Sequence, residues 1–204
     1  MPKDKTASHQ LVTKAAKQEF LANGFLKASM RRIGQKANMT QAGLYRHYAS
    51  KESMFEAIVE PAIKEIQLWQ IHHTQSQFAS IESMKTGSES FSGTDVDLMR
   101  EVIYKYKDEF RMILVCSQGT KYEHFIDDLV RLEQEEMMNS LATLKAHNKN
   151  VREISAEEMH VLLSAYVTAL FEPLVHDWPI EKAIHNLRVV EEFFTPGWKK
   201  IMGF

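Results

Sequence analysis

The 204-residue sequence predicts an all-α fold. Glycine and proline, the residues that most often break helices, are scarce, with eight and five copies. Apolar residues recur three or four positions apart along most of the chain, which is the spacing of one helix face. No segment alternates apolar and polar residues convincingly over the length of a strand.

The first helix is expected over residues 6–22. Its apolar positions follow four-residue spacing, with charged residues between them. These positions are Leu11, Val12, Ala15, Ala16 and Phe20. Asn23 and Gly24 then form a strong stop signal, because glycine reaches the left-handed conformation without a Cβ clash.

Two short helices are expected next. Ser29 is suited to cap the second helix, and Thr40 the third, which is expected over residues 40–47. Between them Asn38 takes a turn, since asparagine tolerates positive φ better than most residues. Leu44 is the clearest inward residue of the third helix.

The fourth helix is expected over residues 51–73, with Ser50 as its cap. Pro61 either kinks this helix or marks a restart, because proline removes one backbone hydrogen bond and crowds the preceding turn. Residues 74–95 are rich in Ser, Thr and Gly, and they are the best candidate for a loose connection.

The rest of the chain is expected to form further helices. Their predicted ranges are 95–106, 108–117, 120–147, 155–175 and 180–195. Asp95 is the expected cap of the first of these, and Ser155 with Glu158 makes a capping box for the fourth. Pro196-Gly197 leaves open whether the last helix ends or bends there.

Charge is distributed unevenly along the chain. Residues 1–60 carry ten Lys and Arg against five Asp and Glu, whereas the remainder carries 15 against 22. A basic N-terminal part on an acidic body indicates a polyanionic partner for that part. The alternative is a basic face that is only solvated.

Two short capped helices behind a supporting helix predict a helix-turn-helix, in which the second short helix enters the major groove of DNA. On that helix Gln41 can present donor and acceptor to a base edge, with adenine as its bidentate match. Arg46 can reach guanine or phosphate, and Tyr45 and His47 carry donors suited to phosphate oxygens.

Three further residues fit the same interpretation. Lys51 and Ser29 each stand at the start of a helix, where backbone N–H groups and the helix dipole favour an anion. Gly43 leaves the surface flat enough for close approach to DNA. The alternative is a small three-helix packing unit with a polar outside.

Residues 11–59 closely resemble the N-terminal domain of the TetR family of bacterial repressors. The features that carry the resemblance are Ala15-Ala16, Phe20, Gly24-Phe25, Ser29-Met30-Arg31-x-Ile33-Gly34, Thr40-x-x-x-Leu44-Tyr45-x-His47-Tyr48, Ser50-Lys51-Glu52 and Phe55. Two positions depart from the usual family pattern, Asn38 in place of Gly and Gly34 in place of Ala, and Gly34 should slightly weaken the second helix.

The resemblance implies DNA contacts from the second and third helices and from the start of the fourth. The residues expected to make these contacts are Ser29, Arg31, Thr40, Gln41, Ala42, Gly43, Tyr45, Arg46, His47 and Lys51. It also implies two domains, which we place at residues 1–52 for DNA binding and 53–204 for a helical ligand-binding and dimerisation body.

A homodimer is expected on independent grounds, because one recognition helix buries little surface whereas a two-fold dimer reads two half-sites of an operator. The last two helices have wide apolar faces suited to an interface. The expected dimerisation residues are Leu162, Tyr166, Leu170, Leu187, Val190 and Phe194. The alternative for each is a place in the core of one chain.

The middle helices are rich in Met, Phe and Tyr, and large apolar pockets with few polar groups bind lipophilic ligands. The candidate ligand-binding residues are Met99, Ile103, Tyr104, Phe110, Tyr122, Phe125, Met159 and Phe171. The alternative is an ordinary core. A regulator controlled by a protein partner, with no small-molecule inducer, is the second hypothesis for the whole chain.

Other chemistry finds little support. His72-His73, His124 with Asp127 and Asp128, and His176-Asp177 lack the spacing of metal motifs. Phosphate-cradling, dinucleotide and nucleophile-elbow motifs are missing from the sequence, and Glu133, Glu135 and Glu136 read as a solvated helix face. We therefore expect no enzyme activity, no cofactor and no metal.

The expected location is the cytoplasm. A single cysteine, Cys116, excludes an internal disulfide, and the polar N-terminus lacks a secretory signal. No apolar run reaches the roughly 20 residues that span a membrane. A redox role for Cys116 is not favoured, since a buried thiol is the commoner state.

Overall fold

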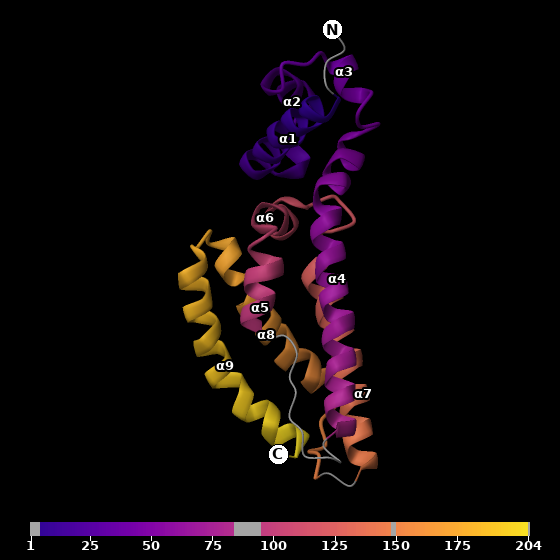
Figure 1. The fold of residues 1–204 in the computed structure, drawn as a ribbon, viewed down its shortest axis with the longest axis vertical. Helices are drawn as coiled ribbons and strands as arrows, with labels where there is room; N and C mark the ends of the chain where they lie inside the picture. The colour runs from indigo at the N-terminus through magenta and orange to yellow at the C-terminus, as the bar shows by residue number, and fades with distance from the viewer. Residues whose placement is uncertain (1–4, 84–94, 148–149, 204) are drawn as a thin grey trace. The chain divides into compact units, whose positions relative to one another are not determined.

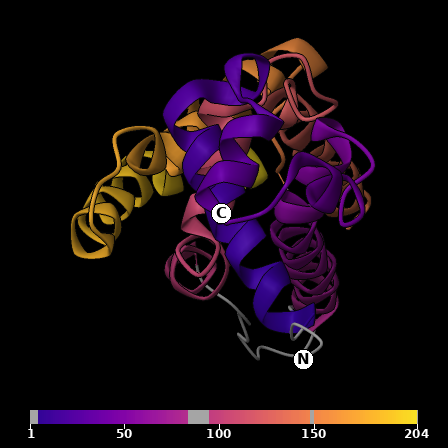
Figure 2. The same ribbon diagram turned by 90° about the horizontal axis from the view of Figure 1, so that it is seen from above.

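The computed structural model describes residues 5–83, 95–147 and 150–203, and every regular element in these ranges is a helix (Figure 1 and Figure 2). This confirms the predicted all-α fold. None of the helices in the described ranges combines the length and the hydropathy that crossing a bilayer requires.

The chain divides into two compact units. Unit 1 consists of Met1–Glu65 together with Tyr106–Glu123, and unit 2 consists of Ile66–Lys105 together with His124–Phe204. A segment of the middle of the chain therefore packs with the N-terminal helices. The predicted functional boundary between residues 52 and 53 stays a prediction.

Unit 1 contains five helical segments. They are α1 (Lys5–Lys27), α2 (Met30–Lys36), α3 (Gln41–Tyr45), the first part of α4 (Lys51–Ser83) and α6 (Lys107–Cys116). Its core holds a cluster of aromatic rings, in which the Phe55 ring centroid lies 5.1 Å from Phe20 and 5.6 Å from Phe25. An ion pair between Lys17 and Glu109 joins α1 to α6.

Gly24 and Asn38 interrupt the helices of unit 1 at the positions that the sequence predicts. Gly24 breaks α1 with φ 69° and ψ 164°, a conformation that is essentially restricted to glycine, and the chain makes one more turn to Lys27. Asn38 takes φ 53° between α2 and α3. The helix α3 is shorter than predicted, because Arg46 and His47 form a turn.

The helix α4 begins as predicted, with the backbone N–H of Ser53 donating to Ser50 Oγ at 3.1 Å. Pro61 lies inside it, and the helix continues to Ser83. The predicted loose connection is therefore wrong over residues 74–83, since a polar composition disfavours a helix only weakly. Residues 84–94 lie outside the described residues.

Unit 2 contains the rest of α4, α5 (Asp95–Asp97), the π-helix η1 (Leu98–Ile103), α7 (Phe125–Ala146), α8 (Ala156–Val175) and α9 (Ile180–Met202). The helix α8 packs against both α7 and α9. Its predicted capping box is present, because the Ser155 N–H donates to Glu158 Oε2 at 2.8 Å and the Glu158 N–H to Ser155 Oγ at 3.2 Å.

Three predicted ranges of the body differ from the structure. Residues 95–106 form a short α-helix and a π-helix rather than one capped α-helix, and Asp95 lies inside the helix. The helix α7 begins at Phe125, because Thr120 turns the chain by donating to Ser117 O. The helix α9 continues through Pro196-Gly197 to Met202, so these residues do not end it.

Candidate nucleic-acid interface

The turn between α2 and α3 is set by local hydrogen bonds. The Arg32 N–H donates to Ser29 Oγ at 3.5 Å, and the Gly43 N–H donates to Thr40 Oγ1 at 3.1 Å, so both predicted caps are present. The Met39 N–H donates back to Gly34 O at 2.9 Å. These bonds fix the angle at which α3 leaves the turn.

Glycine at position 34 has a packing reason. A Cβ atom there would lie 3.1 Å from Met39 O, tighter than ordinary contacts, in the turn that joins α2 to α3. Gly34 thus lets the turn close tightly, although glycine inside a helix costs conformational entropy. The sequence alone indicated only the cost.

The polar side chains of α3 face solvent. Exposed residues of this segment are Thr40, Gln41, Ala42, Tyr45, Arg46 and His47. Leu44, by contrast, is fully buried and anchors α3 in the core of unit 1. Tyr45 leaves 45% of its surface exposed although it is a large aromatic residue. This surface is therefore free to meet DNA, and base contact by these residues stays a prediction.

Gly43 does not lie on that exposed surface. It is buried, and a Cβ atom at this position would lie 3.2 Å from Thr40 Oγ1. The Gly43 N–H donates to the capping Thr40 Oγ1, and its predicted place at the DNA contact stays a prediction. On α2, Arg31 is exposed and Ser29 is half-buried.

A buried carboxylate that sequence reasoning missed holds α1 to α2. Glu19 is fully buried and accepts from Arg32 Nε at 2.6 Å, Lys36 Nζ at 3.1 Å and the Ser29 N–H at 3.2 Å. Desolvation alone would raise its pKa, but the bonds from Arg32, Lys36 and Ser29 outweigh it and lower the pKa. The available signal was position, since Glu19 follows Ala15 by four residues on the apolar face of α1.

Lys51 is engaged inside unit 1. Its Nζ donates to Phe25 O at 2.7 Å and to Leu26 O at 3.2 Å, and it lies 4.4 Å from the centroid of the Phe25 ring. A cation is favourable there because the last carbonyls of α1 point at it. Its predicted contact with a DNA phosphate stays a prediction.

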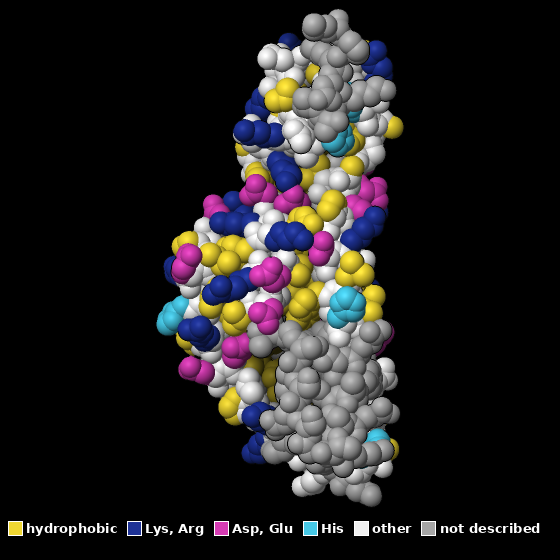
Figure 3. Space-filling view, viewed as in Figure 1, with side chains coloured by type: hydrophobic (Ala, Val, Ile, Leu, Met, Phe, Trp, Pro, Cys, Tyr) yellow, Lys and Arg dark blue, Asp and Glu magenta, His cyan; other side chains and the backbone are white. Residues whose placement is uncertain are grey.

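Lys and Arg side chains lie over the N-terminal helices on the face shown in Figure 3. A supporting helix, a tight turn and a capped short helix with an exposed polar face define a helix-turn-helix DNA-binding protein. Residues 12–58 match the sequence profile described as bacterial regulatory proteins of the tetR family. The match covers the N-terminal part of the chain, which therefore contains a DNA-binding domain of the tetR type.

Three solved structures of TetR-family regulators are similar to this chain. PfmR from Thermus thermophilus is 16% identical, with a TM-score of 0.49 over 88% of this chain and 96% of that chain. A regulator from Mesorhizobium loti is 16% identical, with a TM-score of 0.39 over 95% and 98%. One from Streptomyces coelicolor is 17% identical, with a TM-score of 0.30 over 94% and 96%. A comparison with curated proteins gives no match.

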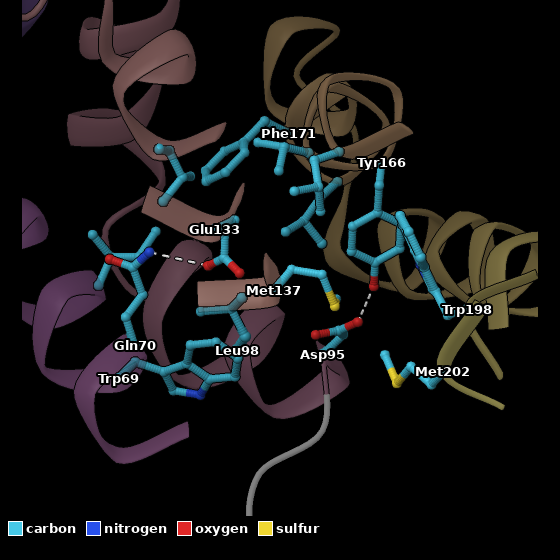
Figure 4. Close-up of a pocket in the computed structure, with 15 residues that line it drawn as sticks. Trp69, Gln70, Asp95, Leu98, Glu133, Met137, Tyr166, Phe171, Trp198 and Met202 are labelled. Atoms are coloured by element: carbon cyan, nitrogen blue, oxygen red, sulfur yellow. Dashed lines mark hydrogen bonds between the residues drawn. The ribbon is translucent and has the colours of Figure 1, made fainter. Parts of the chain in front are cut away.

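Unit 2 contains a cavity of about 200 Å³ (Figure 4). It is lined by residues of α4, α5, η1, α7, α8 and α9. The lining residues are Ile66, Trp69, Gln70, Asp95, Leu98, Leu129, Glu133, Met137, Leu163, Tyr166, Val167, Leu170, Phe171, Trp198 and Met202. Sequence reasoning expected a pocket in this part of the chain, but from largely different residues.

Of the eight predicted ligand-binding side chains, Phe171 lines this cavity. Tyr104 donates from its hydroxyl to Trp178 O at 2.9 Å, and burial with nearby Asp177 and Glu181 raises its pKa to about 12. Phe110 and Tyr122 belong to unit 1. The remaining four are buried or half-buried in unit 2 without lining the cavity, and they are Met99, Ile103, Phe125 and Met159.

The predicted dimerisation residues divide in a similar way. Tyr166 and Leu170 line the cavity, and Leu187 is buried in the core of unit 2. Leu162, Val190 and Phe194 are half-buried. Periodicity identified the apolar faces of α8 and α9, but it does not separate a cavity wall from a core or an interface.

The interpretation of Glu133 as part of a solvated helix face is wrong. Glu133 lines the cavity, and its Oε1 accepts from Gln70 Nε2 at 3.1 Å, whereas Glu135 is exposed as expected. Burial raises the pKa of Glu133, and the nearby carboxylates of Glu136 and Asp95 raise it further. Burial also raises the pKa of the Cys116 thiol, which keeps it protonated.

Within the described ranges, no group of three or more His, Cys, Asp or Glu side chains is arranged to hold a metal ion. The arrangement offers two chemically distinct sites. One is an exposed polar helix face on unit 1, and the other is a partly open, mainly apolar cavity in unit 2.

Proposed function

We propose that this chain is a cytoplasmic transcriptional repressor that binds a palindromic operator as a homodimer and is released from it by a small lipophilic molecule. The observation that carries DNA binding is the exposed polar face of α3, held at a fixed angle by the caps at Ser29 and Thr40. A helix presented in this way fits the major groove of B-form DNA.

A dimer is supported by the outer faces of α8 and α9. Val161, Val189 and Phe193 leave 65%, 53% and 78% of their surfaces exposed. Large apolar side chains exposed in this way favour burial against a partner. A second copy of the chain is the partner that supplies a second recognition helix for a two-fold site.

Release by a ligand requires a shift between two states of the dimer. The ligand must bind more tightly to a state whose recognition helices are spaced wrongly for DNA. A 100-fold loss of operator affinity corresponds to about 3 kcal/mol of differential ligand binding. The helix α4 is the natural connection, because its residues contribute to both units.

The test begins with selection of duplexes from a random pool by the purified chain, followed by titration of the enriched duplex. We expect a palindromic consensus, two chains per duplex and an affinity that falls steeply with salt. Absence of duplex affinity at low ionic strength would contradict DNA binding. Light scattering without DNA checks the dimer, which a monomeric mass would contradict.

Regulation by a protein partner is a second candidate for the control step. The exposed apolar residues of α9, Val189 and Phe193, are the observation that favours it. If the chain is monomeric in solution with these residues exposed, a protein partner becomes the better account. If the chain is a dimer that buries them, the small-molecule account stands.

A further inference from the structure

The cavity of unit 2 has an unusual charge balance for a mainly apolar site. Two carboxyl side chains, Asp95 and Glu133, lie among its lining residues, and none of its described lining residues is Lys, Arg or His. The lining carries formal negative charge with no counter-ion in its own wall. Unpaired charge in a mainly apolar site is unfavourable even where the site is partly open, so this arrangement requires an explanation.

The hydrogen-bond partners of the two carboxyl groups are neutral. Glu133 Oε1 accepts from the amide of Gln70 at 3.1 Å, and Asp95 accepts from the hydroxyl of Tyr166 (Figure 4). No described residue donates to Glu133 Oε2. Each carboxyl group is therefore oriented by one neutral donor and keeps acceptor capacity for a further partner.

The walls around these carboxyl groups offer aromatic faces. Trp69 and Trp198 lie on opposite sides of the cavity in Figure 4, and Tyr166 stands 6.4 Å from Trp198 between ring centroids. The faces of Trp and Tyr rings attract organic cations. Met137 and Met202 add polarizable thioethers that adapt to ligand shape.

The local backbone also departs from regular structure beside the cavity. Leu98, a lining residue, begins the π-helix η1, and Asp95 lies in the short helix just before it. Single-turn π-helices are rare and occur often at functional sites. The irregular turn brings a carboxylate and an apolar side chain into the same wall of the cavity.

We propose that this cavity binds a compact organic cation, an aromatic ammonium ion whose charge meets Asp95 and Glu133 and whose ring packs between the tryptophans. The size follows from the volume, because an apolar cavity of about 150 Å³ accepts benzene, and 200 Å³ accommodates about ten non-hydrogen atoms. This inference deepens the proposed function and rests on the cavity being its effector site.

The charge argument selects this class over neutral and anionic ligands. A neutral lipophile of the same shape would leave both carboxyl groups without a counter-ion, and an anion would meet like charge. Burial raises the pKa of Glu133, and the nearby carboxylates of Glu136 and Asp95 raise it further, so a cation beside these groups would be favourable.

Three probes of nearly equal size and different charge test the proposal. They are phenyltrimethylammonium, its neutral isostere tert-butylbenzene and the anion benzenesulfonate. Binding to the full-length chain is measured by calorimetry and by fluorescence, since Trp69 and Trp198 are two of the three tryptophans in the sequence. We expect the cation to bind at least about tenfold more tightly than the neutral isostere, and the anion not to bind.

Two variants and a matched control locate the effect. Glu133→Gln and Asp95→Asn should each weaken cation binding about tenfold while leaving tert-butylbenzene within about twofold. Glu135→Gln removes an exposed carboxylate of the same helix and should change neither affinity. Melting curves of each variant without ligand establish that the fold is intact.

Several outcomes overturn the proposal. They are equal binding of the cation and its neutral isostere, undiminished cation binding by Glu133→Gln, and absence of cation binding at about 1 mM, a concentration that detects even weak complexes. Release of the operator complex is measured with the same probes. Release by tert-butylbenzene or benzenesulfonate alone would support a ligand-responsive repressor but contradict a cationic effector. Cation binding without release would support a cation-binding cavity but contradict its role as the effector site.

Discussion

Glu19 in unit 1 and Glu133 in unit 2 are chemically identical side chains that the fold treats in opposite ways. Glu19 is buried with two cations and a backbone N–H as partners, and its pKa is lowered. Glu133 lines a cavity with one neutral amide as partner, and its pKa is raised. A buried charge whose partners are complete holds the fold together, whereas one whose partners are incomplete is available to a ligand.

The same distinction, between a polar group with partners inside the protein and one without, separates Lys51 from Gln41 in unit 1. Lys51 is satisfied by carbonyl groups at the end of α1. Gln41 is exposed, and no described residue forms a hydrogen bond with its side chain. On this comparison Lys51 contributes first to stability, and Gln41 is free to read a base. The following predictions test the distinction in order of expected effect.

Removing the satisfied carboxylate should have the largest effect. Glu19→Ala should lower the free energy of unfolding by about 3 kcal/mol, because Arg32, Lys36 and the Ser29 N–H lose their common acceptor. This loss is smaller than the largest losses on breaking buried ion pairs, because the Arg32 and Lys36 side chains are 47% and 42% exposed and can be hydrated again. Urea denaturation measures it, with Glu153→Ala at a 91% exposed side chain as control. If Glu19→Ala lowered the free energy of unfolding by no more than Glu153→Ala does, the structural role of Glu19 would be contradicted.

Removing the unsatisfied amide should leave the fold intact and change DNA recognition. Gln41→Ala should cost about 2 kcal/mol of preference at one base position of the selected operator, with unchanged melting temperature. Competition between the operator and single-base variants measures the preference. Equal weakening of operator and random duplex would show that Gln41 does not read a base.

Lys51→Ala distinguishes stability from phosphate binding. Loss of its bonds to α1 should cost about 1 to 2 kcal/mol of unfolding free energy, measured by urea denaturation. A direct phosphate contact would in addition reduce the slope of log affinity against log salt by about one. An unchanged slope with reduced stability assigns Lys51 to the fold alone, and the reverse result assigns it to DNA.

Glu133→Gln should have the smallest effect on the fold, and of opposite sign. The substitution removes a carboxyl group that lacks a counter-ion, so at neutral pH the melting temperature should rise by about 2 °C. Differential scanning calorimetry measures it, and Glu135→Gln is the control. A fall in melting temperature would mean that the Glu133 charge has a partner inside the protein.

The two carboxyl groups should also respond to pH in opposite directions. Because the folded-state pKa of Glu19 is lowered, its contribution to stability is present above the unfolded pKa and is lost as pH falls through the folded value. Because the pKa of Glu133 is raised, stability instead falls as pH rises from the unfolded value through the folded one. Unfolding curves of Glu19→Gln and Glu133→Gln against pH should therefore diverge from the parent chain with opposite slopes.

Features that depend on neighbouring residues could be predicted from the sequence. Ser29 and Thr40 cap their helices and Asn38 takes positive φ because hydrogen bonds and sterics within a few residues decide these outcomes. The polar positions of α3 were predicted to face outward for the same local reason. Leu44 is buried as predicted, whereas Ala42, which could also have belonged to the inner face, is exposed.

Features that depend on distant residues could not be predicted in this way. Glu133 receives its hydrogen bond from Gln70, which lies far away in the sequence, and the cavity wall combines six helical elements. Apolar periodicity marks the inner face of a helix but does not reveal whether that face meets a core, a cavity or a partner. For this reason only Phe171 of the predicted pocket residues lines the cavity.

The sequence by itself determined the all-α fold, the helix-turn-helix with its caps, and the match of residues 12–58 to the tetR family, because those properties follow from residue spacing and local backbone chemistry. The tertiary structure decided which charges are satisfied. Arg32 and Lys36 reach Glu19, whereas no described cation lines the cavity beside Glu133. The energy of a charge depends on the groups that packing brings around it, and packing is a property of the whole chain.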